Sequence, residues 1–411
     1  MLCMRRIYQS LLEEYLELFP CVAVVGPRQC GKTTLVKSLG TPWHYFDAER
    51  ASDLAAIEPD PEQFLRLYSE RTIIDEAQML PGLFSALRVE VDRDRAKKGR
   101  FIITGSSSPE LMRSVSETLA GRVGIIEMSP FLWAETLRGE IGQPIRMIAS
   151  GSCSPRDLAG VEIIEAMSGR VADYWFKGGY PEPWLTDDAR FSERWMDHYV
   201  RTYLQRDVGQ LFPGLNREKF RLFVQVLAGL SGQTLNYSEV ARVLGVSQPT
   251  VRDYFEIAHG TFLWRKLPAY EKDARKRIVK APKGYFRDSG LLHYLMRIPD
   301  LQALLGHPMV GRSWEGMVVE EILRQLNALG IAYDPYYYRT AAGAEVDLVF
   351  EGMFGLVPIE IKRGQRVDQR DLRGLNSFVK ERGCAFGIVV NNDFAPRLYT
   401  EKIVGIPFEC L

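Results

Sequence analysis

The sequence predicts an α/β protein whose first domain is a parallel sheet, and two observations lead to this fold class. Short apolar runs alternate with helical patterns in the first third of the chain, at residues 21–25, 72–74, 101–103 and 123–126. Such alternation favours a parallel sheet with helices on both faces. The 411 residues are also too many for one ordinary core, which indicates two or three domains.

Composition excludes several classes of protein. Hydrophobic residues make up 46% of the chain and charged residues 25%, close to the average for soluble globular proteins. Lys+Arg and Asp+Glu both number 52, so only a local cluster could indicate a nucleic-acid partner. The six cysteines are scattered without a C-x-x-C pair, which favours reduced thiols in a cytoplasmic protein. We expect no membrane association, because no apolar run reaches roughly 18 residues and the N-terminus lacks a signal-peptide core.

The first apolar run leads into a glycine-rich turn that matches the pattern G-x-x-x-x-G-K-T. The expected cofactor-binding residues here are Gly26, Pro27, Arg28, Gln29, Cys30, Gly31, Lys32, Thr33 and Thr34. In this pattern backbone N–H groups surround a phosphate, the lysine reaches the outer phosphates and the threonine hydroxyl ligates Mg²⁺. A helix from about Lys32 to Leu39 would add its positive dipole end. The alternative is a plain glycine turn, but the position between an apolar run and a helix favours an ATP-binding loop.

The second apolar run ends in two acids. Asp75 would hold Mg²⁺ through water, and Glu76 would orient or deprotonate the attacking water. The third run ends at Thr104, whose side chain could contact the γ-phosphate, although a polar strand end with a turn explains it equally well. The sequence therefore predicts an ATP-hydrolysing site with Lys32 and Glu76 as catalytic residues and Mg²⁺ as cofactor.

A helix-turn-helix is expected over residues 238–251, with Gly245 at the turn and Ser247 capping the second helix. The segments 261–270 and 277–286 would then pair as strands, which is the layout of a winged helix. Nine Lys or Arg side chains lie here against two acids, at positions 265, 266, 272, 275, 276, 277, 280, 283 and 287. They predict a basic wing that grips DNA phosphates without reading sequence. The alternative is a module that packs against protein.

The tail of the chain alternates as strands, at residues 335–339, 344–350, 357–361 and 386–390, after an amphipathic helix over 314–329. Asp347 lies in the second of these strands and Glu360 in the third, so a turn near residue 352 lets the two strands pair as a hairpin. Residues two apart share a strand face, so Glu360 and Lys362 point together. The preceding helix carries Glu315 and Glu320. A half-exposed sheet face alternates in the same way, which is the alternative to a site.

Six strings give the chain a family resemblance. They lie at residues 26–34, 73–78, 119–122, 178–181, 203–207 and 343–347. On these strings the chain resembles a prokaryotic family of AAA-like ATPases with a C-terminal domain called DUF4143. The resemblance covers almost the whole chain, with its weakest match at residues 140–160. It implies an ATPase core, a winged-helix region and a tail similar to the PD-(D/E)xK nucleases.

For the tail, the resemblance implies a metal site in which Asp347, Glu360 and Glu315 bind Mg²⁺ and Lys362 is the catalytic lysine. Because all four residues are present, we expect this site to be competent. In AAA-type enzymes an arginine from a neighbouring subunit often completes the ATP site. Arg122 and Arg206 are the candidates, and such an arginine would require a homo-oligomer. A surface arginine paired with a nearby acid is the alternative for either one.

Four segments are therefore predicted. They are an AAA-like P-loop ATPase domain (1–140), a linker and helical region (141–233), a winged helix (234–287) and a nuclease-like domain (288–411). Residues 139–160 are expected to be a loop. The nucleotide state of the first domain would control how the wing and the tail engage DNA. The alternative is an ATP-dependent regulatory switch for a protein partner, with an inactive nuclease fold.

Overall fold

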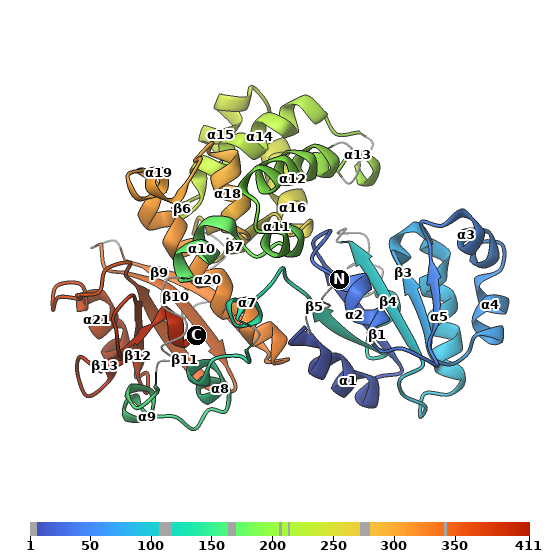
Figure 1. Ribbon diagram of the computed structural model, residues 1–411, viewed down its shortest axis with the longest axis horizontal. Helices are drawn as coiled ribbons and strands as arrows, with labels where there is room; N and C mark the ends of the chain where they lie inside the picture. The colour runs from blue at the N-terminus through green and yellow to red at the C-terminus, as the bar shows by residue number, and fades with distance from the viewer. Residues whose placement is uncertain are drawn as a thin grey trace. The chain divides into compact units, whose positions relative to one another are not determined.

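The computed structural model describes residues 6–106, 117–137, 139–162, 170–204, 208–212, 214–271, 280–340 and 343–411. The chain forms two compact units (Figure 1). The first unit is Met1–Pro130 with the short pieces Gly260–Phe262 and Asn327–Gly330. The second unit contains Phe131–His259, Leu263–Leu326 and Ile331–Leu411.

The first unit is built on a five-stranded sheet in the order β2-β3-β4-β1-β5. Its strands are β1 (Cys21–Gly26), β2 (His44–Asp47), β3 (Thr72–Asp75), β4 (Phe101–Ser106) and β5 (Val123–Glu127). Every pairing is parallel, which confirms the predicted sheet. All six residues of β1 are buried between β4 and β5, which explains their continuous apolar run. The sequence did not predict β2, an edge strand whose residues are only half-buried.

Short helices connect these strands. They are α1 (Tyr8–Leu18), α2 (Lys32–Lys37), α3 (Ala51–Ile57), α4 (Pro61–Leu67), α5 (Pro81–Arg93) and the 3₁₀ turn η1 (Ala77–Met79). Helix α2 follows β1 directly across the glycine-rich loop and ends two residues earlier than expected. The core of the unit joins side chains from the sheet and from α5, including Ile74, Ile103 and Leu87. The loop between β1 and α2 is thus anchored at both ends in buried structure.

The second unit begins with a run of helices. They are α7 (Trp133–Thr136), α8 (Gln143–Ala149), α9 (Pro155–Ala159), α10 (Arg170–Lys177), α11 (Pro181–Thr186), α12 (Ala189–Thr202), α13 (Val208–Leu211) and α14 (Arg217–Leu230). The expectation of a loop over residues 139–160 is wrong, since α8 and α9 lie within it. Its Pro and Ser residues start helices here: Pro144 lies in the first turn of α8, and Ser154 forms a capping box with Asp157 at the start of α9.

Helices α15 (Tyr237–Leu244) and α16 (Gln248–Gly260) follow, joined by a tight turn. Gly245 ends α15 with φ of 61°, a left-handed conformation that favours glycine, and the Ser247 hydroxyl accepts a hydrogen bond from the N–H of Thr250 at 3.2 Å. A small antiparallel sheet contains β6 (Gln233–Thr234), β7 (Trp264–Leu267) and β8 (Lys283–Phe286) in the order β6-β8-β7. The predicted pairing of two strands after the second helix is therefore present, with shorter strands than expected.

The C-terminal sheet has six strands in the order β13-β14-β12-β11-β10-β9. Its strands are β9 (Tyr333–Arg339), β10 (Glu345–Gly352), β11 (Gly355–Ile361), β12 (Gly387–Asn391), β13 (Arg397–Leu398) and β14 (Ile403–Pro407). Helix α21 (Arg373–Arg382) packs against this sheet. Helices α18 (Ser289–Leu295), α19 (Leu301–Leu305) and α20 (Val310–Ala328) precede the sheet in the chain, and the 3₁₀ turn η4 (Phe408–Cys410) follows it. Strands β10 and β11 form the predicted hairpin, with Leu348 opposite Ile359.

Within the described ranges, no helix is both long enough and apolar enough to cross a lipid bilayer. The five cysteines there, at positions 21, 30, 153, 384 and 410, are all free thiols. The scattered cysteines therefore form no disulfide framework in this part of the chain.

Replacing Leu227 by alanine tests the helical core of the second unit. Its side chain is fully buried in α14, whereas Leu222 on the same helix is 40% exposed. Removing a buried leucine side chain costs about 2–5 kcal/mol, because a cavity remains. We expect Leu227→Ala to lower the urea midpoint of the unfolding transition clearly, and Leu222→Ala to leave it almost unchanged. Equal midpoints for the two variants would contradict this packing.

Candidate functional site

The loop between β1 and α2 turns tightly because two of its positions accept only glycine. A Cβ at Gly26 would lie 2.1 Å from the carbonyl oxygen of Met128, so no side chain fits there. Gly31, the residue before α2, has φ of 100°, in the left-handed region. Both positions of the G-x-x-x-x-G-K-T pattern therefore need glycine, Gly26 because a side chain would clash and Gly31 because of its backbone conformation.

The side chain of Lys32 is folded back into this loop. Only 5% of the residue is exposed, and its Nζ donates to the carbonyl oxygens of Gly26 at 3.1 Å and Pro27 at 2.9 Å. Carbonyl groups are neutral acceptors, and a phosphate oxygen is a stronger, charge-assisted one. The geometry therefore allows the ammonium to exchange its bonds to the loop for bonds to an anion held by the same loop.

Asp75, at the end of β3, collects three hydroxyl donors. Its Oδ2 accepts from Thr33 Oγ1 at 2.7 Å and from the Tyr45 hydroxyl at 2.6 Å, and its Oδ1 accepts from Thr104 Oγ1. Burial, followed by the hydrogen bond to Asp75, raises the pKa of Tyr45, so this phenol remains a donor. A hydroxyl beside a carboxylate is an oxygen ligand set that suits Mg²⁺, so Thr33 and Asp75 fit the expected ion.

Glu76 follows in a strained backbone conformation, with φ of 54°. Its Oε2 accepts hydrogen bonds from Gln78 Nε2, from Ser106 Oγ at 2.9 Å and from Ser106 N at 3.1 Å. Burial opposes ionisation, but the ammonium of Lys32 and these hydrogen bonds outweigh it and lower the pKa of Glu76. Thr104, besides donating to Asp75, accepts from the Glu76 N–H at 3.2 Å. The side chain of Glu76 is therefore ionised at neutral pH and fixed in direction.

The other predicted residues of the loop differ in exposure. Arg28 pairs with Glu49 at 3.0 Å, and Cys30 is fully buried. Gln29 has a positive φ of 58° and is exposed, as is Thr34 at the start of α2. The sequence reasoning did not predict Glu49, because it lies after β2, the strand that was not predicted.

Arg6 is a second residue that the sequence reasoning missed. It precedes α1, is only 5% exposed, and donates to the carbonyl oxygens of Cys30 and, at 2.8 Å, of Ser129. A guanidinium group thereby joins the glycine-rich loop to the segment after β5. No local pattern marks such an arginine, since its partners are backbone carbonyls far away in the sequence.

Of the two arginines proposed to complete the ATP site, Arg122 and Arg206, the structure describes only Arg122. Arg122 is engaged by Asp92 in a two-pronged ion pair, with Nε and Nη2 each 2.8 Å from a carboxylate oxygen. Its Nη1 also donates to the carbonyl of Ala120 at 2.9 Å. In this structure Arg122 is therefore an arginine paired with a nearby acid, which is the alternative to an arginine that completes the ATP site. Arg206 lies outside the described residues.

The acids predicted for the tail line one cleft of about 650 Å³ in the second unit. Helix α20 contributes Glu315, β10 contributes Glu345 and Asp347, and β11 contributes Glu360; we call these four residues and their surroundings the acidic cleft. Lys362 follows β11 and its Nζ lies 2.8 Å from Glu360 Oε1. Burial, followed by the charges of Glu315 and Glu360, raises the pKa of Asp347. The sequence thus predicted that Glu315, Asp347, Glu360 and Lys362 lie together, and it did not predict Glu345 as a member of the site.

A lysine that the sequence reasoning did not place in this cleft lies among these acids. Lys283 on β8 has its Nζ 2.5 Å from Glu315 Oε1, 3.0 Å from Glu345 Oε1 and 3.8 Å from Asp347 Oδ1. Among the residues that the structure describes, no three His, Cys, Asp or Glu side chains are arranged to hold a metal ion. The cleft as built does not fit the expected Mg²⁺, because an ammonium already faces its carboxylates.

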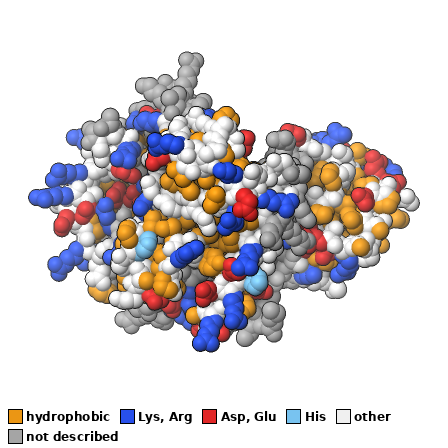
Figure 2. Space-filling model, turned by 90° about the horizontal axis from the view of Figure 1, so that it is seen from above, with side chains coloured by type: hydrophobic (Ala, Val, Ile, Leu, Met, Phe, Trp, Pro, Cys, Tyr) orange, Lys and Arg blue, Asp and Glu red, His pale blue; other side chains and the backbone are white. Residues whose placement is uncertain are grey.

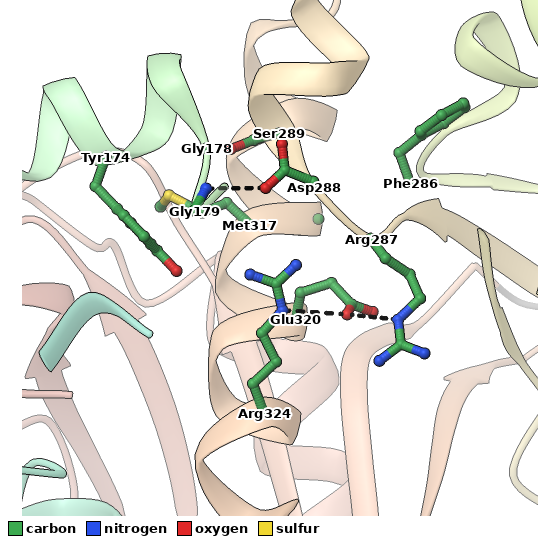
Figure 3. Close-up of a pocket in the computed structure, with 11 residues that line it drawn as sticks. Tyr174, Gly178, Gly179, Phe286, Arg287, Asp288, Ser289, Met317, Glu320 and Arg324 are labelled. Atoms are coloured by element: carbon green, nitrogen blue, oxygen red, sulfur yellow. Dashed lines mark hydrogen bonds and ion pairs between the residues drawn. The ribbon is translucent and has the colours of Figure 1, made fainter. Parts of the chain in front are cut away.

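Glu320, the other acid of α20, belongs to a separate buried ion cluster. Five residues separate it from Glu315, so the two point to different sides of the helix. Its Oε2 accepts from Arg265 Nη2 at 3.1 Å and Arg287 Nε at 3.3 Å, and it lies 3.7 Å from Arg324 Nε. Figure 3 shows Arg287 and Arg324 on either side of this carboxylate. Burial opposes its ionisation, but Arg265 and Arg287 outweigh it and lower the pKa of Glu320.

In the basic cluster that was predicted to face DNA, every member that the structure describes is paired with an acidic side chain of the protein. Each of its five described members forms an ion pair: Arg265 and Arg287 with Glu320, Lys266 with Glu256, Lys280 with Glu271, and Lys283 with the acidic cleft. The members at 272, 275, 276 and 277 lie outside the described residues. On the face shown in Figure 2, basic and acidic side chains are interspersed.

Comparison with known proteins defines the class of the chain. Residues 19–137 match the family model described as an AAA domain, residues 168–302 match a domain of unknown function (DUF8612), and residues 310–411 match a domain of unknown function (DUF4143). The protein therefore has an AAA-type P-loop ATPase-like domain followed by a DUF4143 domain.

Two relatives and one solved structure illustrate what this chain is similar to. It is 36% identical over 365 residues to an uncharacterized protein of Mycobacterium tuberculosis and, equally, to one of Mycobacterium bovis, covering 88% of this chain and 75% of each relative. A Walker-type ATPase of Pyrococcus abyssi is 17% identical with a TM-score of 0.41, covering 71% of this chain and 95% of that chain. The chain belongs to the family of AAA-like ATPases that carry a C-terminal DUF4143 domain.

Arg6→Ala tests whether this arginine holds the phosphate loop in place. Hydrogen bonds from charged donors are worth about 1.5–3 kcal/mol each. We expect the variant to bind ATP at least about tenfold more weakly, a loss of roughly 1.4 kcal/mol in binding free energy. Isothermal titration calorimetry measures the affinity, with Arg66→Ala as control because Arg66 is an exposed arginine of the same unit. Equal affinities for the two variants would remove Arg6 from the site.

Proposed function

We propose that this chain binds ATP together with Mg²⁺ in its first unit and hydrolyses it. The observation that carries the proposal is the convergence of two segments: Thr33 Oγ1, in the first turn of α2, donates to Asp75 Oδ2 of β3 at 2.7 Å. Lys32 and Glu76 lie beside this pair, close enough for the ammonium to lower the pKa of the glutamate. The match to an AAA domain supports the same assignment.

Each side chain then has a distinct part. Lys32 exchanges its carbonyl partners for the outer phosphates, and the backbone N–H groups of the glycine-rich loop, which Pro27 lacks, surround the phosphate chain. Thr33 and Asp75 would hold Mg²⁺, which would neutralise charge on the phosphates. Glu76, ionised and held by Gln78 and Ser106, orients and deprotonates the attacking water. Thr104 links Asp75 to the backbone of Glu76 and so fixes the positions of the two acids relative to each other.

The two catalytic side chains are separable by substitution. Lys32→Ala removes the main cationic partner of the phosphates, so we expect loss of ATP binding and of hydrolysis together. Glu76→Gln keeps the shape of the site and removes the base, so we expect ATP binding near the wild-type affinity with hydrolysis reduced at least about 100-fold. Fluorescent-nucleotide binding and steady-state phosphate release measure the two properties.

Glu58→Gln provides the matched control, because Glu58 is an exposed acid of the same unit. It should bind and hydrolyse ATP like the wild type. Wild-type turnover by Glu76→Gln would rule out the role assigned to Glu76, and ATP binding by Lys32→Ala would rule out the loop as the phosphate site.

For the output of the ATPase, the balanced charges favour a regulatory switch that contacts a protein partner over an enzyme that engages DNA. Five members of the basic cluster are paired with acids of the same unit, and three of them, Arg265, Lys283 and Arg287, are at most 8% exposed. Buried, paired cations do not contact DNA phosphates. A basic wing would have to rely on Lys266 and Lys280, whose ion pairs lie at the surface, and on the four members at 272–277, which are outside the described residues.

DNA dependence of the ATPase separates these two outputs. We expect steady-state hydrolysis to be the same with duplex, single-stranded and branched DNA as without DNA, and to vanish in Lys32→Ala. Stimulation by DNA that is lost in the double variant Lys276→Glu/Arg277→Glu, two predicted wing residues, would instead establish DNA engagement by the wing.

A homo-oligomer forms part of the same proposal. The Arg122–Asp92 pair lies at the surface with both side chains partly exposed, and surface ion pairs contribute little stability, so Arg122 is able to leave Asp92 for a neighbouring nucleotide. Size-exclusion chromatography with light scattering, with and without ATP and Mg²⁺, measures assembly. An Arg122→Ala variant that assembles and hydrolyses ATP like the wild type would exclude Arg122 as the completing arginine.

A further inference from the structure

We propose that Lys283 takes the place of the divalent cation in the acidic cleft, so that this site of the DUF4143 domain is filled by an internal ammonium group. The inference concerns the second unit alone and does not depend on ATP hydrolysis in the first. Its basis is the position of one buried lysine among carboxylates from two elements of the fold.

The contacts of Lys283 are those expected of a resident cation. Its Nζ lies 2.5 Å from Glu315 of α20, 3.0 Å from Glu345 and 3.8 Å from Asp347, both of β10. Glu345 and Asp347 are two residues apart on one strand, so both side chains project from the same face. The residue is only 4% exposed, so its charge is balanced by these acids rather than by water.

Several of the carboxylate oxygens that a metal would need already have partners in the protein. Glu315 Oε1 accepts from both Lys283 and the Tyr285 hydroxyl, and Asp347 Oδ2 accepts from the Ile361 N–H at 2.8 Å. Glu360 Oε1 is paired with Lys362. Among the described residues, Glu360 Oε2 is a buried oxygen of the cleft without a hydrogen-bond partner. A divalent cation bound there would share the cleft with the ammonium of Lys283, and the two positive charges would repel each other.

The two lysines of the cleft therefore have different parts. Lys362 directly follows β11 and is the lysine of the Glu-x-Lys string, and its side chain is 32% exposed at the cleft. Lys283 comes from β8, outside the C-terminal sheet, and lies in the segment that matches DUF8612. The charges of Glu315, Asp347 and Glu345 outweigh the effect of burial and raise its pKa, so the ammonium is retained at all physiological pH values. The ion pairs also fasten β8 to α20 and β10.

Binding of Mn²⁺ alone to the full-length, nucleotide-free protein tests the proposal, with free Mn²⁺ measured by electron paramagnetic resonance. The comparison is between the wild type and Asp347→Asn, because any Mn²⁺ bound elsewhere on the chain contributes equally to both. Lys283→Met removes the ammonium while keeping a side chain of similar length, and Lys283→Met/Asp347→Asn shows whether new binding lies in the cleft. Lys266→Met is the matched control, since Lys266 pairs with Glu256 outside the cleft.

We expect the wild type, Asp347→Asn and Lys266→Met to bind the same amount of Mn²⁺. Lys283→Met should bind one more Mn²⁺ per chain, and the double variant should lose it again. Wild-type binding that Asp347→Asn abolishes would overturn the proposal, because the cleft would then hold a metal beside the lysine. Failure of a folded Lys283→Met to gain Mn²⁺ would overturn it as well. If Lys283→Met does not fold, the comparison of the wild type with Asp347→Asn still tests the proposal. Equal Mn²⁺ binding by these two proteins supports it, and weaker Mn²⁺ binding by Asp347→Asn rejects it.

Discussion

Folding removes several charged side chains of this protein from water, and each must then meet opposite charge or several hydrogen-bond donors, because an isolated buried charge is very costly. Asp75 meets the hydroxyls of Thr33, Tyr45 and Thr104. Glu320 meets three arginines, and Lys283 meets three carboxylates. The first arrangement places the loop, β2, β3 and β4 around one carboxylate, which is the geometry that the proposed ATP site uses. The other two join α20 to the small sheet of the second unit.

The two ion clusters on α20 lead to a different interpretation of the basic residues in the second unit. A run of lysines and arginines ordinarily indicates a surface for a polyanion. Here Arg265 and Arg287 face Glu320, and Lys283 faces the acidic cleft, so three of the five described members of the cluster form ion pairs inside the unit. The same pairing supplies the acidic cleft with a cation. Basic residues and acidic residues that suggest two functional sites, one for DNA and one for a metal, thus neutralise each other.

The strings that carry the family resemblance also divide by their physical role. Those at residues 26–34 and 73–78 bring chemistry to one place in the first unit. The string at 178–181 has an architectural role, because Asp288 caps α18 through the Leu291 N–H and accepts from the Gly179 N–H, both at 2.9 Å. A Cβ at Gly178 would lie 2.3 Å from a carboxylate oxygen of Asp288, so glycine is needed for this close contact (Figure 3).

The sequence by itself determined the parallel sheet, the phosphate loop, the acids after β3 and the β10–β11 hairpin with its acids and lysine, because each depends on neighbours in the chain or on simple periodicity. It did not determine that residues 139–160 contain helices, since proline and serine mark loops and helix starts alike. Only the tertiary structure decided the partners of Arg6, Lys283 and Glu320. Those partners are distant in sequence, and the cost of burying a charge becomes apparent only when the packing that buries it is known.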